Sequence, residues 1–221
     1  MKTQKLTLIT VFIIFTFQLS AQVSIGLKTG YTRAWEKYDV EVPEDARIHV
    51  RGFNVAGMIY FKLNDFLSLG IEPGYVERGA ACIPGWDGGF PDPTFRGDTE
   101  LFLKYAELPV LIQGHLPVLN GKLEVFGKAG YGLAYMTTAF EKTTDLDGIV
   151  PPVRTKLDLS TDNRLNRLDH GFHGTIGLSK GLGAGRIFIE TAYYSSVRDA
   201  DRNNFSRNRN LNFNLGYFIE L

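Results

Sequence analysis

The segment 210-NLNFNLGYFIEL-221 places a large apolar side chain at every second position. Polar or small residues stand between them, and only Phe218 breaks the alternation. A period of two over a whole segment predicts a β-strand with one apolar and one polar face. In a soluble sandwich the apolar face would pack on another sheet, whereas in a transmembrane barrel it would contact lipid and the polar face would line the lumen. The apolar set comprises Leu211, Phe213, Leu215, Tyr217, Ile219 and Leu221.

The N-terminal segment has the pattern of a secretory signal peptide. Two lysines precede an apolar run over residues 6–17, and small residues then lead into Gln22. We therefore expect residues 1–21 to be a cleaved signal peptide and residues 22–221 to be the exported mature domain. The alternative is an uncleaved anchor, but the run is short for a spanning helix. No later apolar stretch approaches about 20 residues, so any membrane insertion must use strands.

Composition agrees with one exported β-rich domain. The chain has 221 residues, with 24 Gly, 16 Phe and 10 Tyr, and 44% of its residues are hydrophobic. Loss of the signal peptide removes two lysines, which leaves 22 basic against 24 acidic residues and gives no reason to expect nucleic acid as a partner. Cys82 is the only cysteine, so an intrachain disulfide is excluded, and we expect an unpaired loop thiol.

Alternating segments recur along the chain, and short turns and long polar connections join them in strict alternation. Strands are expected near residues 23–35, 48–63, 67–75, 101–116, 123–140, 168–182, 186–196 and 210–221. The short turns fall near 64, 119 and 184, and the long connections near 36–47, 79–100, 141–167 and 197–208. This pattern predicts an all-β fold, an eight-stranded antiparallel up-and-down transmembrane β-barrel. Its short turns and both termini would lie in the periplasm, and its long loops outside the cell.

A soluble exported lipid-binding barrel is an alternative to the membrane protein. Soluble barrels such as lipocalins turn their apolar face inward around a ligand. Here the inward set would be glycines, lysines, glutamates and asparagines, which make a poor ligand pocket and a suitable polar lumen. We therefore favour the transmembrane barrel.

Two motifs carry a family resemblance: GLKTG at 26–30 and LKYAELPVLIQ at 103–113. With the signal ending in LSAQ, they resemble the PorT-like outer-membrane β-barrel family (outer membrane protein beta-barrel domain), whose central strand typically reads Y-x-E-I-P-L-L-x-K. Leu108 stands where that pattern has Ile, and Gln113 where a basic residue is common. The resemblance implies an eight-stranded barrel integral to a Gram-negative outer membrane. The family's namesake implies a link to protein secretion.

Some small outer-membrane barrels are enzymes, and a few residues of this chain are of the types that catalysis uses. The best candidates are Asp169, His170, His173 and Ser179. His170 and His173 differ by three positions and would point to opposite faces of a strand, so they cannot grip one metal ion. His49 and His115 each stand alone and are interpreted as rim residues. No nucleophile, base and orienting carboxylate within mutual reach can be identified.

A nucleotide site is also rejected. The glycines at 181, 183 and 185 lie in a turn between strands, with no helix to receive a phosphate. We accordingly expect no catalytic, cofactor-binding or metal residues and a protein that is not an enzyme. The alternative is an outer-membrane enzyme acting on lipid or protein, with a site at one rim built from Asp169, His173 and a nearby Ser.

Charged residues at inward positions have a structural interpretation. Glu72, Glu107, Glu190, Lys28, Lys62 and Lys128 all fall on the face expected to line the lumen, together with Gln113. The interior of an eight-stranded barrel is just filled by side chains, and an unpaired buried ion costs several kcal/mol. We therefore predict an ion-pair network that plugs the barrel. A proton or small-ion path is the functional alternative.

Aromatic residues near strand ends favour a bilayer, and the long connections favour binding. The candidates for interfacial belts are Trp35, Tyr75, Tyr135, Tyr193 and Tyr217. The loop 79–100 is rich in aromatics and the loop 141–167 is more polar, so any binding function would lie there. The expected partners are outer-membrane lipid, the barrel-assembly machinery during insertion, and envelope or secretion-system proteins. No cofactor is expected.

Overall fold

The computed structural model describes residues 22–38, 47–82, 97–145, 151–161, 164–202 and 206–221. Its strands are β1 (Val23–Tyr38), β2 (Arg47–Ile48), β3 (Val50–Lys62), β4 (Leu67–Ile71), β5 (Gly74–Cys82), β6 (Gly97–Val118), β7 (Leu123–Asp145), β8 (Val153–Lys156), β9 (Leu168–Leu182), β10 (Gly185–Asp201) and β11 (Ser206–Glu220). Among the described residues no helix is long and apolar enough to cross a membrane. The predicted signal peptide lies outside these ranges.

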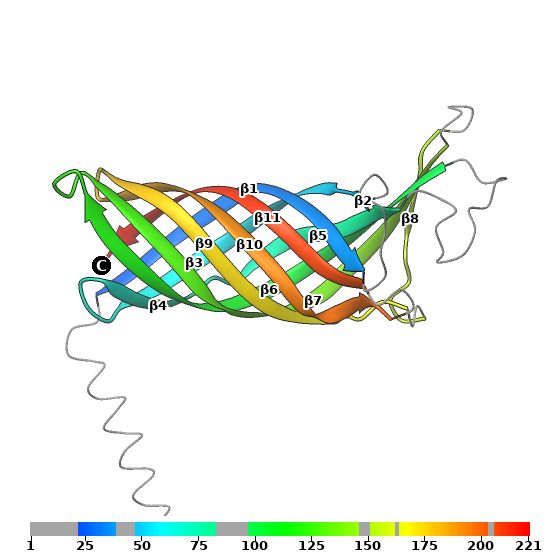
Figure 1. Ribbon diagram of the computed structural model, residues 1–221, viewed down its shortest axis with the longest axis horizontal. Coiled ribbons are helices and arrows are strands. Elements are labelled where there is room, and N and C mark those ends of the chain that lie inside the picture. The colour runs from blue at the N-terminus through cyan, green and yellow to red at the C-terminus, as the bar shows by residue number, and fades with distance from the viewer. Residues whose placement is uncertain (1–21, 39–46, 83–96, 146–150, 162–163, 203–205) are drawn as a thin grey trace, which may run out of the picture.

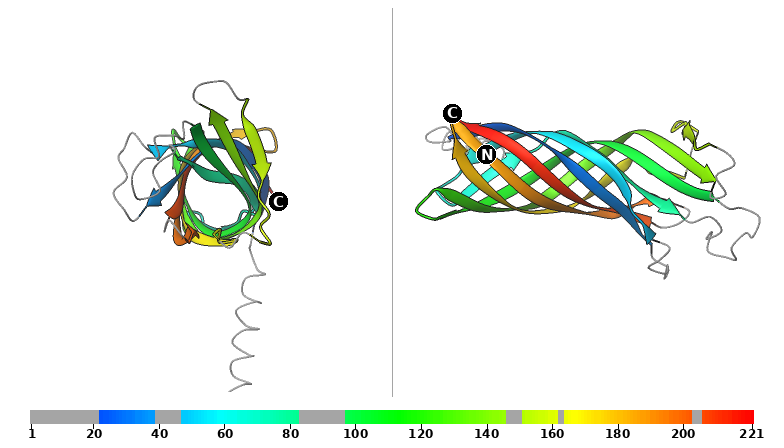
Figure 2. Two further views of the ribbon diagram at one scale, coloured as in Figure 1. Left: turned by 90° about the vertical axis from the view of Figure 1, so that its right-hand side faces the viewer. Right: turned by 90° about the horizontal axis from the view of Figure 1, so that it is seen from above.

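The strands close into an antiparallel ring. β1 pairs with both β3 and β11, and the ring continues from β11 through β10, β9, β7 and β6. β4 and β5 together fill the remaining place between β3 and β6. They are one wall strand interrupted at Pro73, which has no N–H to donate to a ladder. The predicted eight-stranded up-and-down barrel is confirmed (Figures 1 and 2).

Three short turns connect strands at one rim, as predicted. In the first, the Asn64 side chain accepts hydrogen bonds from the backbone N–H groups of Phe66 and Leu67 at 2.8 and 3.0 Å. In the second, Asn120 and Gly121 both have positive φ, 57° and 79°, a conformation that these residue types tolerate. These turns lie at the end of the barrel that also carries the C-terminus (Figure 1).

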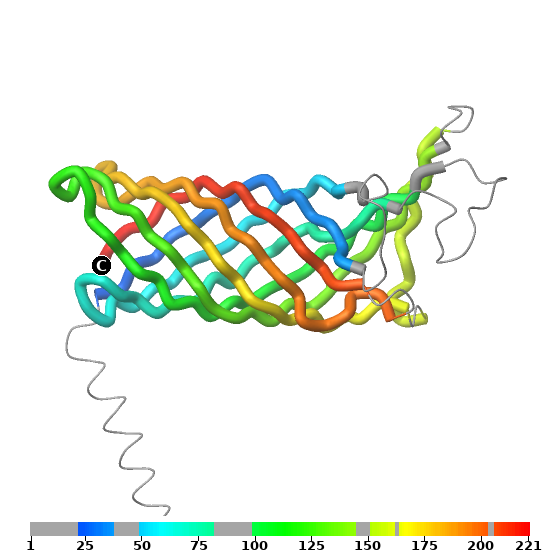
Figure 3. The backbone as a smooth tube through the Cα atoms, in the orientation of Figure 1, coloured from blue at the N-terminus to red at the C-terminus, as the bar shows by residue number. Residues whose placement is uncertain are grey.

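At the opposite rim the strands are longer than expected. β6 begins at Gly97 and β7 continues to Asp145, so each strand extends several residues into an expected connection. β8 lies within the third expected connection and pairs with β7. Ladder pairing satisfies backbone groups, so these segments stay regular beyond the closed ring (Figure 3). Cys82 consequently ends β5 and does not lie in a loop; most of loop 79–100, residues 83–96, lies outside the described residues.

The predicted facing of the strands is correct for the closing strand and for most of the wall. In β11 Phe213, Leu215 and Tyr217 are exposed on the outside, whereas Phe218 is buried within the lumen. β6, whose alternation is irregular in sequence, places Leu108, Val110 and Ile112 outside. Its inward residues include both polar and apolar side chains, Gln113 and Leu111 among them, which is why the sequence pattern was mixed.

The predicted aromatic belt is only partly exposed. Tyr135, Tyr193 and Tyr217 are exposed on the outer surface. Trp35 and Tyr75 are partly covered by neighbours: Trp35 lies 6.2 Å from the Tyr193 ring, between ring centroids, and Tyr75 donates a hydrogen bond to Glu77 at 2.9 Å.

Candidate functional site

Four charged side chains meet inside the lumen and form a closed quartet: Lys28 of β1, Glu72 between β4 and β5, Lys128 of β7 and Glu190 of β10. Lys28 Nζ lies 2.6 Å from each of the two carboxylates. Lys128 Nζ lies 2.6 Å from Glu72 and 2.7 Å from Glu190. All four residues are buried, and their charges sum to zero. This part of the predicted interior network is confirmed.

Further hydrogen bonds complete the quartet. Tyr60 Oη donates to Glu72 at 2.6 Å, and the Asn214 amide donates to Glu190 at 2.9 Å. Lys128 Nζ also lies 5.2 Å from the ring centre of Phe126. A buried ion pair is tolerated only where such additional partners satisfy the remaining charge.

A second buried layer surrounds Arg78, on the side of the quartet away from the short turns. Arg78 donates to Glu107, to Asp169 at 3.3 Å and to Asn210 at 3.0 Å, and its guanidinium lies 3.8 Å from the centre of the Tyr194 ring. The expectation that Glu107 pairs within a lysine network is therefore wrong. Arg78 was missed because the strand was expected to end near residue 75, which left this arginine outside the set of inward positions.

Lys62 does not belong to the lumen network. Its side chain is 41% exposed and forms an ion pair with Asp65 at 3.0 Å across the first short turn. Lys62 does follow the alternation of inward positions along its strand, but β3 ends at this residue and the barrel no longer encloses its side chain. This corrects the prediction that Lys62 is an interior charge.

An aromatic cluster separates the quartet from the short-turn rim. It consists of the rings of Tyr60, Phe126, Phe188 and Phe218, packed together with Met58. The break in the alternation at Phe218 is thereby explained, because its ring fills the lumen 6.0 Å from the Phe188 ring. Gly216 makes room for this cluster: a Cβ added there would collide with the Phe188 ring.

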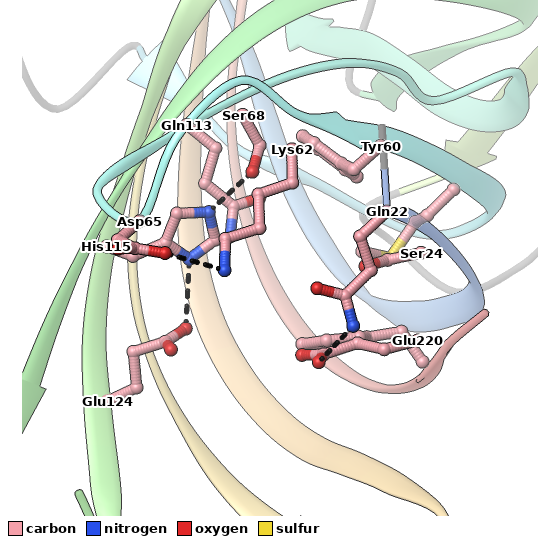
Figure 4. Close-up of a pocket in the computed structure, with 12 residues that line it drawn as sticks. Gln22, Ser24, Tyr60, Lys62, Asp65, Ser68, Gln113, His115, Glu124 and Glu220 are labelled. Carbon is pink, nitrogen blue, oxygen red and sulfur yellow. Dashed lines mark hydrogen bonds and ion pairs between the residues drawn. The ribbon is translucent and has the colours of Figure 1, made fainter. Parts of the chain in front are cut away.

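Beyond the aromatic cluster, a cavity of about 90 Å³ lies at the short-turn rim. The first described residue, Gln22, and the penultimate residue, Glu220, both line it, so it sits where the two ends of the barrel chain meet. Its other lining residues include Ser68, His115 and Glu124 (Figure 4). Polar groups thus converge here on a space that is not filled by side chains.

Ser68, His115 and Glu124 form a hydrogen-bonded chain on the cavity wall (Figure 4). His115 Nε2 lies 2.9 Å from Ser68 Oγ, and His115 Nδ1 lies 3.0 Å from Glu124 Oε1. An ionised carboxylate only accepts hydrogen bonds, so Glu124 requires the proton on Nδ1. Nε2 of the neutral ring is then free to accept the Ser68 hydroxyl proton, which is the arrangement of nucleophile, base and orienting acid.

Neighbouring side chains hold Glu124 in place. Ser179 Oγ donates to Glu124 at 3.4 Å and accepts from Arg186 Nε at 3.1 Å. Arg186 also lies 3.8 Å from the second carboxylate oxygen. The carboxylate therefore faces two donors besides the imidazole.

The strand register brings these residues together. Ser68 of β4 pairs with Gln113 of β6, two positions before His115, and Glu124 of β7 pairs with Pro117, two positions after it. The prediction that His115 stands alone is wrong, as is the expectation that no nucleophile, base and carboxylate come within reach. All three residues fall on inward positions of adjacent strands, close to two of the short turns, and this coincidence in the sequence could have revealed the cluster.

The residues chosen as catalytic candidates do not form one site. Asp169 and Ser179 lie ten positions apart on β9, which is about 33 Å along a strand. Asp169 is buried beside Arg78 and accepts a hydrogen bond from Ser196 at 2.5 Å. The Asp169 carboxylate thus has a serine partner, but both residues belong to the Arg78 layer. Among the described contacts no histidine donates a hydrogen bond to this carboxylate.

The histidines of β9 point to opposite faces, as predicted. His170 contacts the exposed Tyr131, with 2.5 Å between Nδ1 and the phenol oxygen, whereas His173 packs inside on Tyr194 with 4.8 Å between ring centres. His49 packs against Trp35 with 5.4 Å between ring centres. Within the described ranges no group of three or more His, Cys, Asp or Glu side chains is placed to hold a metal ion.

Comparison with known proteins finds similar barrels among solved structures. No family model matches the chain, and no curated protein matches it. Ail, the attachment invasion locus protein of Yersinia pestis, solved with the heparin analogue sucrose octasulfate, is 16% identical, with 91% of this chain and 100% of that chain covered and a TM-score of 0.42. Neisserial surface protein A is 12% identical over 89% of this chain and 97% of that one, with a TM-score of 0.47.

A third similar structure is the N-terminal β-barrel domain of Pseudomonas aeruginosa OprF. It is 10% identical, 90% of this chain and 100% of that chain are covered, and the TM-score is 0.39.

Proposed function

We propose that this chain is an integral protein of the bacterial outer membrane with a structural or interaction role: an anchor that closes its own lumen and presents extended strands at the cell surface. The observation that carries the proposal is an apolar outer wall around an interior filled with paired charges. The PorT-like relationship inferred from the sequence belongs to this proposal, since no family model matches.

The apolar wall runs around the whole ring. Each wall strand exposes large apolar side chains, for example Leu27, Val55, Leu69, Ile112, Leu133, Ile176, Ile189 and Leu215. A soluble monomer rarely exposes so extensive an apolar surface, whereas a transmembrane barrel requires it as the lipid-facing band. This favours the outer-membrane protein over a soluble lipid-binding barrel, in which the apolar face would point inward.

The filled interior argues against a pore. The aromatic cluster, the quartet and the Arg78 layer follow one another along the lumen, and the four ions of the quartet pair with one another. An ion passing through would have to displace partners held at 2.6–2.7 Å. This supports a plugged barrel over a proton or small-ion path.

The strand extension formed by β6, β7 and β8 is the candidate binding surface. Glu100 and Lys142 pair across it at 2.7 Å, and Arg154 of β8 lies 4.4 Å from the centre of the Phe140 ring. All four residues of β8 are exposed, and β8 pairs only with β7 among the described strands. We place this end outside the cell and the short turns with both chain ends in the periplasm, where envelope or secretion-system proteins could reach them.

Refolding of residues 22–221 in detergent tests the proposal. We expect unheated and boiled samples to migrate differently on an SDS gel, and circular dichroism dominated by β-structure. In planar bilayers we expect no steady single-channel current. Identical migration, or recovery of the native protein in the aqueous fraction after osmotic release, would rule out the membrane barrel, and large steady currents would rule out the plug.

A further inference from the structure

The cavity at the short-turn rim is not needed to close the barrel, because the aromatic cluster and the quartet already do so. Its wall nevertheless carries Ser68, His115 and Glu124, with 2.9 Å between Ser68 Oγ and His115 Nε2 and 3.0 Å between His115 Nδ1 and Glu124 Oε1. We propose that this cavity is a serine esterase site that takes short-chain carboxylic esters, with Ser68 as nucleophile, His115 as general base and Glu124 as the positioning residue. This activity goes beyond the anchor role proposed above and replaces the expectation that the chain is not an enzyme.

The geometry meets the requirements of nucleophilic catalysis. A serine hydroxyl is a weak nucleophile unless an adjacent base takes its proton, and the base must hold the correct tautomer. His115 Nε2 is at hydrogen-bond distance from Ser68 Oγ, and Glu124 fixes the other ring nitrogen. Ser179 and Arg186 in turn hold Glu124, so the carboxylate is kept on Nδ1.

The shape of the cavity selects the substrate class. Ser68 is only 5% exposed, so a bulky acyl group cannot approach it. The inner end of the cavity is lined by Met58, Tyr60 and Phe218, which supply apolar contacts for a small alkyl group. The volume of about 90 Å³ favours an acetyl group or one of similar size. The alcohol portion would remain toward the open rim beside Gln22 and Glu220.

The same lining contains donors for the charge that develops during the reaction. The side-chain amide of Gln113 and the ammonium of Lys62 both line the cavity (Figure 4). Donors directed at a developing oxyanion contribute strongly in a site with restricted water. Gln113 is buried and pairs directly with Ser68 across β4 and β6, and its amide nitrogen lies 3.4 Å from His115 Nδ1, so its amide is the first candidate.

The reaction balances without a further reactant except water. Ser68 Oγ attacks the carbonyl carbon while His115 Nε2 takes the hydroxyl proton. The ester C–O bond then breaks, the leaving alkoxide takes that proton from His115, and an acyl-serine remains. Water attacks the acyl-serine with His115 as base, the acid departs, and Ser68 recovers its proton. Ester and water thus yield one carboxylic acid and one alcohol.

A covalent probe provides the test. Refolded residues 22–221 are treated with a small fluorophosphonate, the labelled peptide is identified by mass spectrometry, and hydrolysis of p-nitrophenyl acetate is followed in the same sample. We expect label on Ser68, and we expect S68A to lose both label and hydrolysis. Ser160 lies after β8 at the opposite rim, where it contacts Asp158 and not the cavity, so S160A is the control and should keep both.

The roles of the other two residues separate by kinetics. H115Q removes the general base and should lower kcat by roughly 10²- to 10⁴-fold. E124Q should lower kcat with little change in KM and alter the pH–rate profile, because the amide no longer enforces the Nδ1 tautomer, and E124D should restore part of the rate. A merely structural carboxylate would leave the pH profile of the residual activity unchanged.

The outcomes are decisive in both directions. Wild-type protein that shows heat-dependent migration but takes no label, or takes it on another residue, overturns the esterase site and leaves the membrane barrel intact. Equal hydrolysis by wild type and S68A also overturns it. Loss of heat-dependent migration in the wild type contradicts the barrel itself, which keeps the two failures distinct.

Discussion

The quartet and the cavity both place glutamates beside hydrogen-bond donors, at two levels of one lumen, but their surroundings differ. In the quartet each lysine contacts both glutamates, and the Glu190 side chain is fully buried. In the cavity the side chains of His115 and Glu124 remain 19% and 18% exposed, and Ser68 is bonded to a base that can accept its proton. The proposed plug relies on charged groups whose partners are all satisfied, whereas the proposed esterase site relies on a partly exposed polar chain that could exchange protons with a substrate.

The largest expected effect on stability separates these two levels. Glu190→Ala leaves two buried lysines short of a partner and should cost about 3–5 kcal/mol of unfolding free energy. Glu124→Ala removes a partly exposed acceptor and should cost about 1 kcal/mol. Urea titrations of refolded protein measure both. Equal losses would show that the cavity is as structural as the quartet.

Outward residues at the same two levels report where each level lies in the bilayer. Leu215 pairs with Ile189, the neighbour of Glu190 along β10, whereas Leu221 follows Glu220 at the cavity rim. Leu215→Arg should cost about 2–4 kcal/mol at the bilayer midplane, and Leu221→Arg about 0–1 kcal/mol near the interface. Refolding into lipid vesicles distinguishes them. The reverse order would place the cavity at the membrane centre.

Glu107→Ala tests whether the Arg78 layer behaves like the quartet. Arg78 keeps Asp169 and Asn210 as partners, so the loss should be about 1–3 kcal/mol and smaller than for Glu190→Ala. Glu77→Ala, at a more exposed pair with Lys104, is the control and should cost about 1 kcal/mol or less. A loss for Glu107→Ala no larger than for the control would exclude its layer from the lumen plug.

The smallest effect should come from lengthening the connection before β8, and it fixes which side of the membrane the cavity faces. An epitope tag after Pro151, which is exposed, should cost about 0.6 kcal/mol or less, because loop-closure entropy grows slowly with length. It should bind antibody on intact cells. A tag after Asn64 should disturb the register of β3 and β4. If the Pro151 tag were accessible only after permeabilisation, the cavity would face outward.

Alternation made the barrel predictable, since a period of two assigns faces without knowledge of neighbours. β9 was expected at 168–182 and occupies those residues. Strand ends at the far rim were not predictable, because their regularity depends on ladder partners such as β8, whose sequence does not alternate. Lys62 was misassigned for the same reason: parity says which way a side chain points, but not whether the barrel still encloses it.

The sequence by itself determined the number of wall strands, the apolar exterior and the presence of inward charges at Lys28, Glu72, Lys128 and Glu190, because each follows from parity within one strand. Only the tertiary structure decided which inward groups meet. The stagger of neighbouring strands sets Ser68 beside His115 and Arg78 beside Glu107. Contact between residues 47 or 29 positions apart depends on register and on barrel closure, which are properties of the whole ring and not of any one strand.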